Sequence, residues 1–236
     1  MEQLPGAAAE SNAGAVAGDP HGCGEVGAAS GTAAGSGACG KPEQNIGLYT
    51  HSASPEINMQ DTPEAFRIQW LELESAVRAR LSEPGVVPPA GLAQRSGLEF
   101  LQGICSGELP LPPISKALGF FPVEVESGRV VFQGTPELAY YNPIGSIHGG
   151  WAATLLDSCA GCAIHSMLPA GKGYTTLELK VNFVRAITSD TGPVRAEGKV
   201  IHVGNRVGTA EGRLVDSAGR LHAHATTTCL IFDLPK

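Results

Sequence analysis

Hydrophobic and polar residues alternate along several stretches in the second half of the chain, which is the pattern of half-buried β-strands. In the first stretch one predicted face carries Leu177, Leu179, Val181 and Phe183, and the other face carries Thr176, Glu178, Lys180 and Asn182. The last stretch alternates in the same way, with one face made of Leu221, Ala223, Ala225, Thr227, Cys229 and Ile231. Between them, residues 194–203 and 206–216 predict a hairpin that turns at Gly204-Asn205.

Two regions show helical spacing instead. From Pro63 to Leu81 apolar residues recur every three or four positions, and Asp61-Thr62-Pro63 supplies a cap and an N1 proline. We interpret this amphipathic helix as a packing arm rather than a membrane-surface helix, because its polar face is mixed in sign. A mostly apolar helix is predicted from about Gly149 to Met167. Asp157 and His165 inside it argue against a membrane span, since Asp alone costs about 3 kcal/mol at mid-bilayer.

The remaining patterns along the chain allow the fold class to be predicted. A hairpin is predicted over residues 121–126 and 129–135, and a short helix over Ser96–Cys105. Residues 84–90 have the composition of a linker, so we expect residues 61–90 to form a helix and linker and the folded domain to span residues 91–236. The order of two strands, one long helix and four strands predicts an α+β domain, in which a twisted antiparallel sheet wraps around the helix.

The N-terminal residues 1–60 differ in composition from the rest of the chain. The first forty residues are about half Ala and Gly, and such a segment cannot bury enough apolar surface to offset its ordering entropy, so we predict a disordered tail. Residues 1–64 hold eight acidic residues and one lysine, which accounts for the whole formal net charge of −7. A neutral folded part without a basic run argues against nucleic-acid binding and stays compatible with an anionic small molecule.

The six cysteines do not form an extracellular disulfide framework. Cys159 and Cys162 form a CxxC pattern inside the predicted helix, with no second pair downstream, so we interpret them as small core residues rather than zinc ligands. The N-terminal residues have neither the basic start nor the apolar segment of a secretory signal. We therefore expect a cytoplasmic protein without a membrane partner.

The strongest chemical signal is Asn142-Pro143-Ile144-Gly145-Ser146-Ile147-His148-Gly149-Gly150, followed by Asp157. A lone carboxylate in an apolar helix is costly to bury, and such a group is usually paired or functional. The glycine pair at the expected helix start offers free backbone N–H groups, which can stabilise an oxyanion. A carboxylate and an oxyanion site together indicate hydrolysis of an activated acyl group.

Gly149 and Asp157 are eight residues apart, so one helix would separate them by about 12 Å. A base or nucleophile must act within about 3–3.5 Å of the carbon whose oxygen is held by the N–H donor. Two antiparallel copies could combine Gly149 of one copy with Asp157 of the other, which predicts a site across a two-fold dimer interface. A mostly small stripe would let a second backbone or a slim substrate approach the carboxylate: Gly150, Ala153, Asp157, Ala160, Gly161 and Ile164.

The order of elements and the spacing of Asn142, His148-Gly149-Gly150 and Asp157 resemble the hotdog-fold acyl-CoA thioesterases of the phenylacetate-degradation (PaaI-like) group, over about residues 91–232. The resemblance implies hydrolysis of an acyl- or aryl-acyl-CoA to the free acid and CoA, without metal or cofactor, in a homodimer or homotetramer. It also implies that the Gly149 N–H polarises the thioester carbonyl and that Asn142 orients the thioester or the attacking water. Asp157 of the neighbouring subunit would then act as general base or nucleophile.

Supporting roles follow from the same resemblance. In similar enzymes a Ser or Thr on the next strand supports the carboxylate; Thr176 is the first choice here and Thr175 the second. Some relatives carry Glu in place of Asp157, and the shorter side chain leaves room for water, which favours the general-base route. His148 is expected to cap the helix or orient Asn142 rather than take part in the chemistry.

Substrate contacts are expected near the same helix. The acyl group would enter between two helices beside Trp151 and the small stripe that begins at Gly150. The candidate partners for the CoA phosphates are Lys180, Arg185 and Arg206. His222 and His224 share a predicted strand face, and with no suitably spaced carboxylate or thiol we expect an exposed polar face rather than a metal site.

Two other functions stay open. A non-catalytic acyl-CoA or acyl-carrier binding module on the same fold would keep the ligand groove but would need no Asp157. A hotdog dehydratase would need a catalytic histidine with an acidic partner across the interface. His148 lies near the right helix for that role, but the His-Gly-Gly pattern resembles the thioesterases more.

Overall fold

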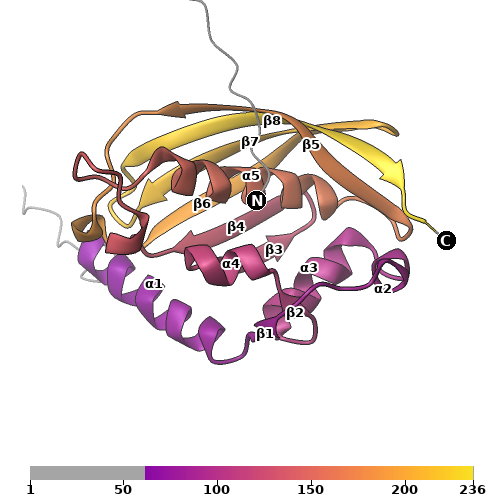
Figure 1. Cartoon of the computed structure of the whole chain (residues 1–236), viewed down its shortest axis with the longest axis horizontal. Helices are drawn as coiled ribbons and strands as arrows, with labels where there is room; N and C mark the ends of the chain where they lie inside the picture. Colours follow the sequence, from indigo (N-terminus) through magenta and orange to yellow (C-terminus); the bar gives the residue numbers. More distant parts are fainter. Residues whose placement is uncertain (1–61, 236) are drawn as a thin grey trace, which may run out of the picture. The chain divides into compact units, whose positions relative to one another are not determined.

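The computed structural model describes residues 62–235, so the tail predicted over residues 1–60 lies outside the described residues. Its centre is a six-stranded antiparallel sheet that curves around helix α5 (Gly149–His165), in the order β3-β4-β6-β7-β8-β5 (Figure 1). The strands are β3 (Phe120–Glu126), β4 (Arg129–Gly134), β5 (Lys172–Phe183), β6 (Val194–Val203), β7 (Val207–Asp216) and β8 (Leu221–Asp233). The predicted α+β class, with two strands, one long helix and four strands, is confirmed.

Helix α5 lies close to the sheet because glycines face it where the two elements approach. Leu155, Leu156 and Cys159 of the helix are fully buried, at 0% exposure. Opposite them, Gly198 of β6 pairs with Gly212 of β7. A Cβ on Gly198 would lie 2.2 Å from the carbonyl oxygen of Cys159. The absence of a side chain at this position therefore sets the distance between helix and sheet.

Strand β5 contains a bulge at Leu177, where its register with β8 shifts between Thr176 and Glu178. Leu179 and Val181 pack on the core around α5, and Thr176 also faces α5, where it contacts Asp157. Leu177 itself is 60% exposed. The prediction that Leu177 shares the face of Leu179 and opposes Thr176 is therefore wrong, because a bulge adds one residue and changes the alternation.

A second register shift places His222 on the side of the sheet that faces α5. Leu214 of β7 pairs with Ala223, but the next residue of β7 pairs with Leu221, so His222 is the extra residue of β8. His222 is 2% exposed and contacts Asp216, whereas Leu221 is only partly buried. The predicted core face of β8 is confirmed from Ala223 onward. The prediction of an exposed His222 is wrong, because the bulge reverses the alternation at the start of the strand.

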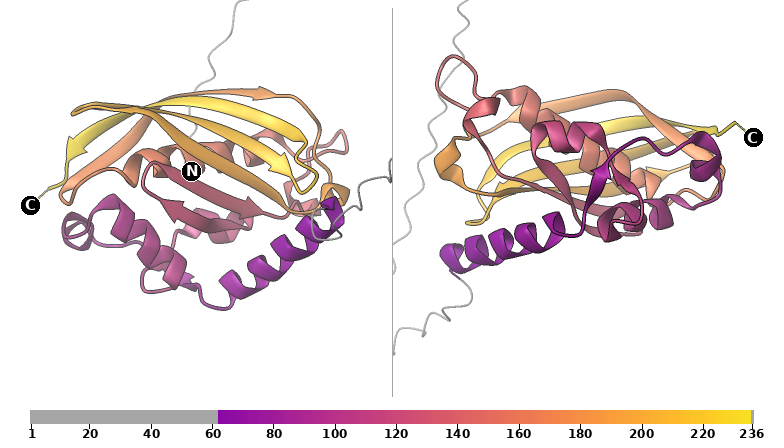
Figure 2. Two further views of the ribbon diagram at one scale, coloured as in Figure 1. Left: turned by 180° about the vertical axis from the view of Figure 1, so that it is seen from behind. Right: turned by 60° about the horizontal axis from the view of Figure 1, so that its bottom comes forward.

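The elements that precede the sheet in the chain gather beside β3 and β4 (Figures 1 and 2). They are α1 (Pro63–Arg78), β1 (Ser82–Pro84), α2 (Pro89–Ala93), α3 (Gly97–Ser106), β2 (Pro110–Leu111) and α4 (Pro113–Leu118). Two 3-10 turns follow later, η2 (Leu138–Tyr140) and η3 (Ser189–Thr191). Within residues 62–235, no helix has the length and apolar character that a membrane crossing requires.

The predicted linker takes part in the fold. Strand β1 pairs in parallel with β2, and α2 begins at Pro89, so residues 84–90 do not form a free connection between α1 and the domain. Helix α1 is capped by Thr62, as expected, and its Val77 is fully buried in a cluster with Ile104 and Phe121. Local composition predicted a linker, but these contacts with later parts of the chain order the segment.

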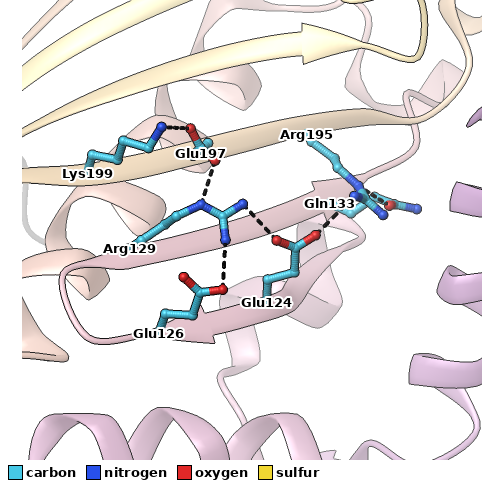
Figure 3. A network of polar contacts seen from close by, with 7 residues as sticks. All are labelled: Glu124, Glu126, Arg129, Gln133, Arg195, Glu197 and Lys199. Atoms are coloured by element: carbon cyan, nitrogen blue, oxygen red, sulfur yellow. Dashed lines mark hydrogen bonds and ion pairs between the residues drawn. The ribbon is translucent and has the colours of Figure 1, made fainter.

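Polar contacts around Gln133, which has no exposed surface, hold α1 on the face of the sheet opposite α5. Gln133 Nε2 donates to the carbonyl oxygen of Trp70 at 2.8 Å and to Glu74 Oε2 at 3.2 Å. Arg195 donates to Gln133 Oε1 at 3.0 Å, and its guanidinium lies 4.3 Å from the centre of the Trp70 ring. The predicted packing role of this helix is therefore observed. Arg129 extends the network along the strands (Figure 3), where it bonds Glu124, Glu126 and Glu197.

Gly198→Ala tests the contact between helix and sheet. The added methyl group would meet backbone rather than a movable side chain, so we expect the free energy of unfolding to fall by about 3 kcal/mol. Urea denaturation measures this change. Gly204→Ala in the β6–β7 turn is the control, since its Cβ would first meet the end of the His202 side chain at 3.3 Å. Equal stability of the two variants would contradict the packing argument.

Candidate active site

The loop before α5 is shaped by the side chain of Asn142. Its Oδ1 accepts hydrogen bonds from the backbone N–H of Ile144 at 3.0 Å and of Ser146 at 3.5 Å. Its Nδ2 donates to Ser146 Oγ at 3.1 Å. Gly145, at the tip, has a φ of +85°, a conformation that glycine adopts without steric cost. In this structure the Asn142 amide therefore orders the loop that leads to the helix.

His148 caps α5, which is one of the two roles expected for it. Its Nδ1 accepts a hydrogen bond from the backbone N–H of Gly150 at 2.9 Å, and its carbonyl oxygen accepts one from Trp151 N at 3.0 Å. The other expected role, contact with Asn142, is not observed: the described polar contacts of Asn142 stay within its own loop. One residue thus satisfies the second and third N–H groups of the helix.

The first N–H group of α5 remains available. The backbone N–H of Gly149 has no hydrogen-bond acceptor among residues 62–235. It stands at the positive end of a 17-residue helix, where the aligned peptide dipoles favour a negative charge. The Phe183 ring lies beside it, since a Cβ on Gly149 would be 3.0 Å from Phe183 Cζ. This end of the helix can therefore stabilise an oxyanion beside an aromatic wall.

A cavity of about 330 Å³ opens at this N-terminal end. It is lined by Ser146, Ile147, Gly149, Ala152, Phe183, Val184, Arg185, Ala186, Ile187, His222 and Ala223. Arg185 is the one Arg or Lys among these residues, and it is exposed. Of the predicted site residues, the structure thus brings Gly149 and Arg185 to one cavity, whereas Asp157 does not line it.

Asp157 forms a second cluster on α5, together with the neighbouring strand. Thr176 Oγ1 donates to Asp157 Oδ1 at 2.9 Å, so the contact implied for Thr176 is present. Thr175, the second choice, is exposed. Asp157 is partly buried, and the hydrogen bond leaves its Oδ2 free to accept another proton donor. The bulge at Leu177 follows directly after Thr176 and does not disturb this contact.

The thiols near Asp157 are poor nucleophiles. Burial raises the pKa of Cys162 to about 12, and burial also raises the pKa values of Cys159 and Cys229 above the ordinary value. Because the thiolate is the reactive form, these cysteines stay protonated and inert at neutral pH. The core role expected for Cys159 is observed, and no group of three His, Cys, Asp or Glu side chains in the described part of the chain could hold a metal ion.

Trp151 is wrongly predicted as a substrate contact. Its side chain is 3% exposed, its Nε1 donates to the carbonyl oxygen of Leu118 at 2.9 Å, and its ring stacks on Tyr140. These contacts make it part of the core. Gly150 is exposed at the helix start.

The remaining predicted contacts are dispersed over the protomer. Lys180 is exposed on β5, and Arg206 is exposed at the β6–β7 turn; neither lines the cavity beside Gly149. The small stripe is open only in its first half, because Ala160 and Ile164 are fully buried and Tyr174 covers Gly161. A second backbone or a slim substrate could therefore approach the Asp157 carboxylate, as predicted, only along the N-terminal half of the stripe.

Sequence reasoning assigned neither Phe183 nor His222 of this cavity to the site. Phe183 was assigned to a core face, but it is 58% exposed and lies against Gly149. His222 was placed on a polar face, and the bulge in β8 moves it to the cavity. No pattern in the sequence marks that bulge, because the residues around it alternate regularly.

Two sequence comparisons relate part of this chain to thioesterases and esterases. A model of the thioesterase superfamily matches residues 144–223. A candidate esterase of Halobacterium salinarum is 37% identical over 84 residues, which are 35% of this chain and 54% of that protein. The match therefore spans about half the length of this relative.

Solved structures share the fold. A phenylacetic acid degradation-related protein of Ralstonia eutropha, described as a candidate thioesterase, is 27% identical over 57% of this chain and 98% of that chain, with a TM-score of 0.51. AziG of S. sahachiroi covers 52% of this chain and 99% of its own (22% identity, TM-score 0.51). A thioesterase of Haemophilus influenzae covers 59% of this chain and 92% of its own (21% identity, TM-score 0.51). The last two comparisons support the fold alone.

Replacing His148 tests its capping role. We expect His148→Ala to lower the free energy of unfolding by about 1 kcal/mol, because the Gly150 N–H loses its acceptor. Asn is a strong N-cap residue, so His148→Asn should restore most of the loss. Thermal and urea denaturation measure both variants. If the Ala variant is as stable as the wild type, the hydrogen bond does not stabilise the helix.

Proposed function

We propose that this chain, which carries a hotdog-fold domain of the thioesterase superfamily, hydrolyses acyl-CoA thioesters in a site shared by two copies of the chain. One observation carries the proposal. The free N–H of Gly149 and the carboxylate of Asp157, paired with Thr176, stand on the same helix but at separate places. The Gly149 N–H can stabilise the oxyanion and Asp157 can activate the attacking water, and thioester hydrolysis requires both.

The separation explains why one copy is insufficient. Eight residues of α5 lie between the two positions, which places them about 12 Å apart along the axis. An attacking water and the carbonyl that it attacks must lie within about 3–3.5 Å of each other. Because α5 is packed along the sheet on its buried side, it cannot bend to close this gap. A second, antiparallel α5 would bring its Asp157 opposite Gly149.

The edge of the sheet supports such a pairing. Strand β5 is 12 residues long and pairs only with β8 among the described strands. Long unpaired edges readily pair with another strand. Leu177, Phe183 and Val184 are more than half exposed on this strand and just after it. A two-fold axis beside β5 would make both the strands and the helices antiparallel.

Beside the edge strand, the accessible part of α5 carries small side chains. Gly150 is exposed, and Ala153 and Asp157 are partly buried. A facing helix could therefore come close to the carboxylate in the first half of α5. The proposed contact needs only this half, since Gly149 and Asp157 both lie within it.

The chemistry follows from these two groups. The Gly149 N–H and the positive helix end stabilise the negative charge that develops on the thioester oxygen. The partner subunit's Asp157, held by its Thr176, takes a proton from a water molecule as that water attacks the carbonyl carbon. The carbon–sulfur bond then breaks, the acid is released, and the CoA sulfur receives the proton. Arg185 at the cavity is the favoured partner for a CoA phosphate among the three predicted cations.

Asp157→Asn tests the base. We expect turnover of an acyl-CoA to fall by about 10³-fold, because general-base catalysis is lost while the amide keeps a similar shape. Release of the CoA thiol, followed with a thiol reagent over a panel of aryl-acetyl and medium-chain substrates, measures it. Ser158→Ala, at the neighbouring helix position, should retain activity. Unchanged turnover by the Asn variant would end the assignment, and tight acyl-CoA binding by the wild type without thiol release would favour the non-catalytic alternative.

Mixed dimers test whether the site is shared. Gly149→Pro removes the N–H at the first helical position, where proline is tolerated, and His148 already has the extended backbone that precedes proline (φ −61°, ψ 132°). Alone, Gly149→Pro should lose about 10²-fold in activity. Coexpressed with Asp157→Asn, it should regain about a quarter of wild-type activity, because half of the dimers are mixed and one of their two sites is intact.

The mixed-dimer experiment distinguishes a site shared by two chains from a site within one chain. Recovery requires that Gly149 of one chain work with Asp157 of another. Activity no higher than the sum of the two inactive variants would show that each copy works alone, and the shared site would then be rejected.

A further inference from the structure

His222 carries an unusual polar atom. Its Nδ1 is the one buried side-chain nitrogen or oxygen without a hydrogen-bond partner among residues 62–235. The residue is 2% exposed. Buried polar atoms are nearly always hydrogen-bonded, and an unpaired one costs about 1–3 kcal/mol. Such an atom calls for a partner that the chain itself does not supply.

The other ring nitrogen is fixed by Asp216. His222 Nε2 lies 2.9 Å from Asp216 Oδ2. Asp216 also accepts hydrogen bonds from the backbone N–H groups of Ala218 and Arg220 and from Arg220 Nε. Burial by itself would raise the pKa of Asp216, but the hydrogen bonds from His222 and Arg220 outweigh it and hold that pKa below the ordinary value. Because a carboxylate can only accept, Nε2 carries the proton in this contact, and in that tautomer Nδ1 is a hydrogen-bond acceptor.

The position of His222 connects this acceptor with the cavity at the helix end. The bulge in β8 turns His222 toward the side of the sheet that holds α5, and the residue lines the same cavity as Gly149 and Arg185. Its carbonyl oxygen accepts hydrogen bonds from the backbone N–H groups of Val184 and Arg185. The cavity wall beside His222 is thus the exposed end of β5 and the residues that follow it.

We propose that His222, oriented by Asp216, is a substrate-binding residue whose Nδ1 accepts a hydrogen bond from an amide N–H of the pantetheine arm of the acyl-CoA. The proposal rests on the thioesterase function proposed above. A thioester carbonyl held by the Gly149 N–H places the sulfur and the arm attached to it in the same cavity. Nδ1 is buried behind the lining of the cavity, so the contact requires a shift of the wall beside it, Phe183–Arg185.

The chemistry of the substrate favours the arm over the acyl group. A simple acyl chain has no hydrogen-bond donor, whereas the first polar group beyond the sulfur of CoA is an amide with an N–H. In the tautomer that donates to Asp216 from Nε2, Nδ1 pairs with such a donor and not with a carbonyl or phosphate oxygen. Arg185, exposed at the same cavity, suits the phosphates at the far end of the arm.

Two substitutions distinguish the roles of the two ring nitrogens of His222. In His222→Gln the amide nitrogen stands where Nε2 stood, so the contact with Asp216 is kept and only the acceptor at the Nδ1 position is lost. In His222→Asn the side-chain amide stands at the Nδ1 position, and the contact with Asp216 is lost. His224→Gln, two residues along the same strand and outside the cavity, is the matched control.

The probe is a CoA thioether that carries a medium-length alkyl group and cannot be hydrolysed. Calorimetry should show that His222→Gln binds it about tenfold more weakly than the wild type, that His222→Asn retains part of the affinity, and that His224→Gln is unchanged. With a hydrolysable acyl-CoA, His222→Gln should raise KM and leave kcat near the wild-type value, since the contact serves binding. Thermal unfolding of each variant shows whether the fold is retained.

Each other outcome argues against the proposal. Equal thioether binding by His222→Gln and the wild type would show that the Asp216 contact is the role of this side chain. A loss of kcat with unchanged binding would indicate that His222 acts on the attacking water, and it would overturn the assignment to the pantetheine arm. In both cases acyl-CoA hydrolysis by the wild type keeps the proposed function standing. If the wild type neither binds nor cleaves acyl-CoA, the proposed function fails and this inference fails with it.

Discussion

A packed α-helix is rigid, and this constraint determines how the site of this protein can be built. Gly149 and Asp157 are held at fixed positions on α5, whose buried side lies against the sheet with glycines at the closest approach. The helix supplies an anion-stabilising end and, two turns later, a carboxylate. Because no local movement can bring these groups together, thioester chemistry that uses both groups implies a second copy of the helix.

Bulges in two edge-proximal strands position the groups that accompany the helix. In β5, the extra residue falls just after Thr176, which keeps its hydroxyl on Asp157 and exposes Leu177 on the unpaired edge. In β8, the extra residue is His222, which turns inward to Asp216 and the cavity. Bulges increase the local twist of a sheet, and both lie beside groups of the proposed site, Thr176 in β5 and His222 in β8.

The resemblance to the PaaI-like thioesterases implied the contact between Thr176 and Asp157, whereas sequence patterns predicted the order of elements and the α+β class, because these depend on local periodicity. They did not predict the bulges, since an extra residue in a strand leaves the alternation intact on either side. Trp151 was also misjudged: nothing local shows that Leu118 and Tyr140 enclose it. Positions that depend on long-range packing therefore stayed beyond the reach of the sequence.

The start of α5 shows how a capping residue can select a single donor. His148 accepts from Gly150 N through its ring and from Trp151 N through its carbonyl oxygen, so two of the first three N–H groups of the helix are satisfied. Only the Gly149 N–H stays free, and it faces the cavity that His222 also lines. A helix end with three open donors would bind water or any anion. With one donor left, the helix dipole acts on one atom of the ligand, which fits a carbonyl oxygen held in a single orientation.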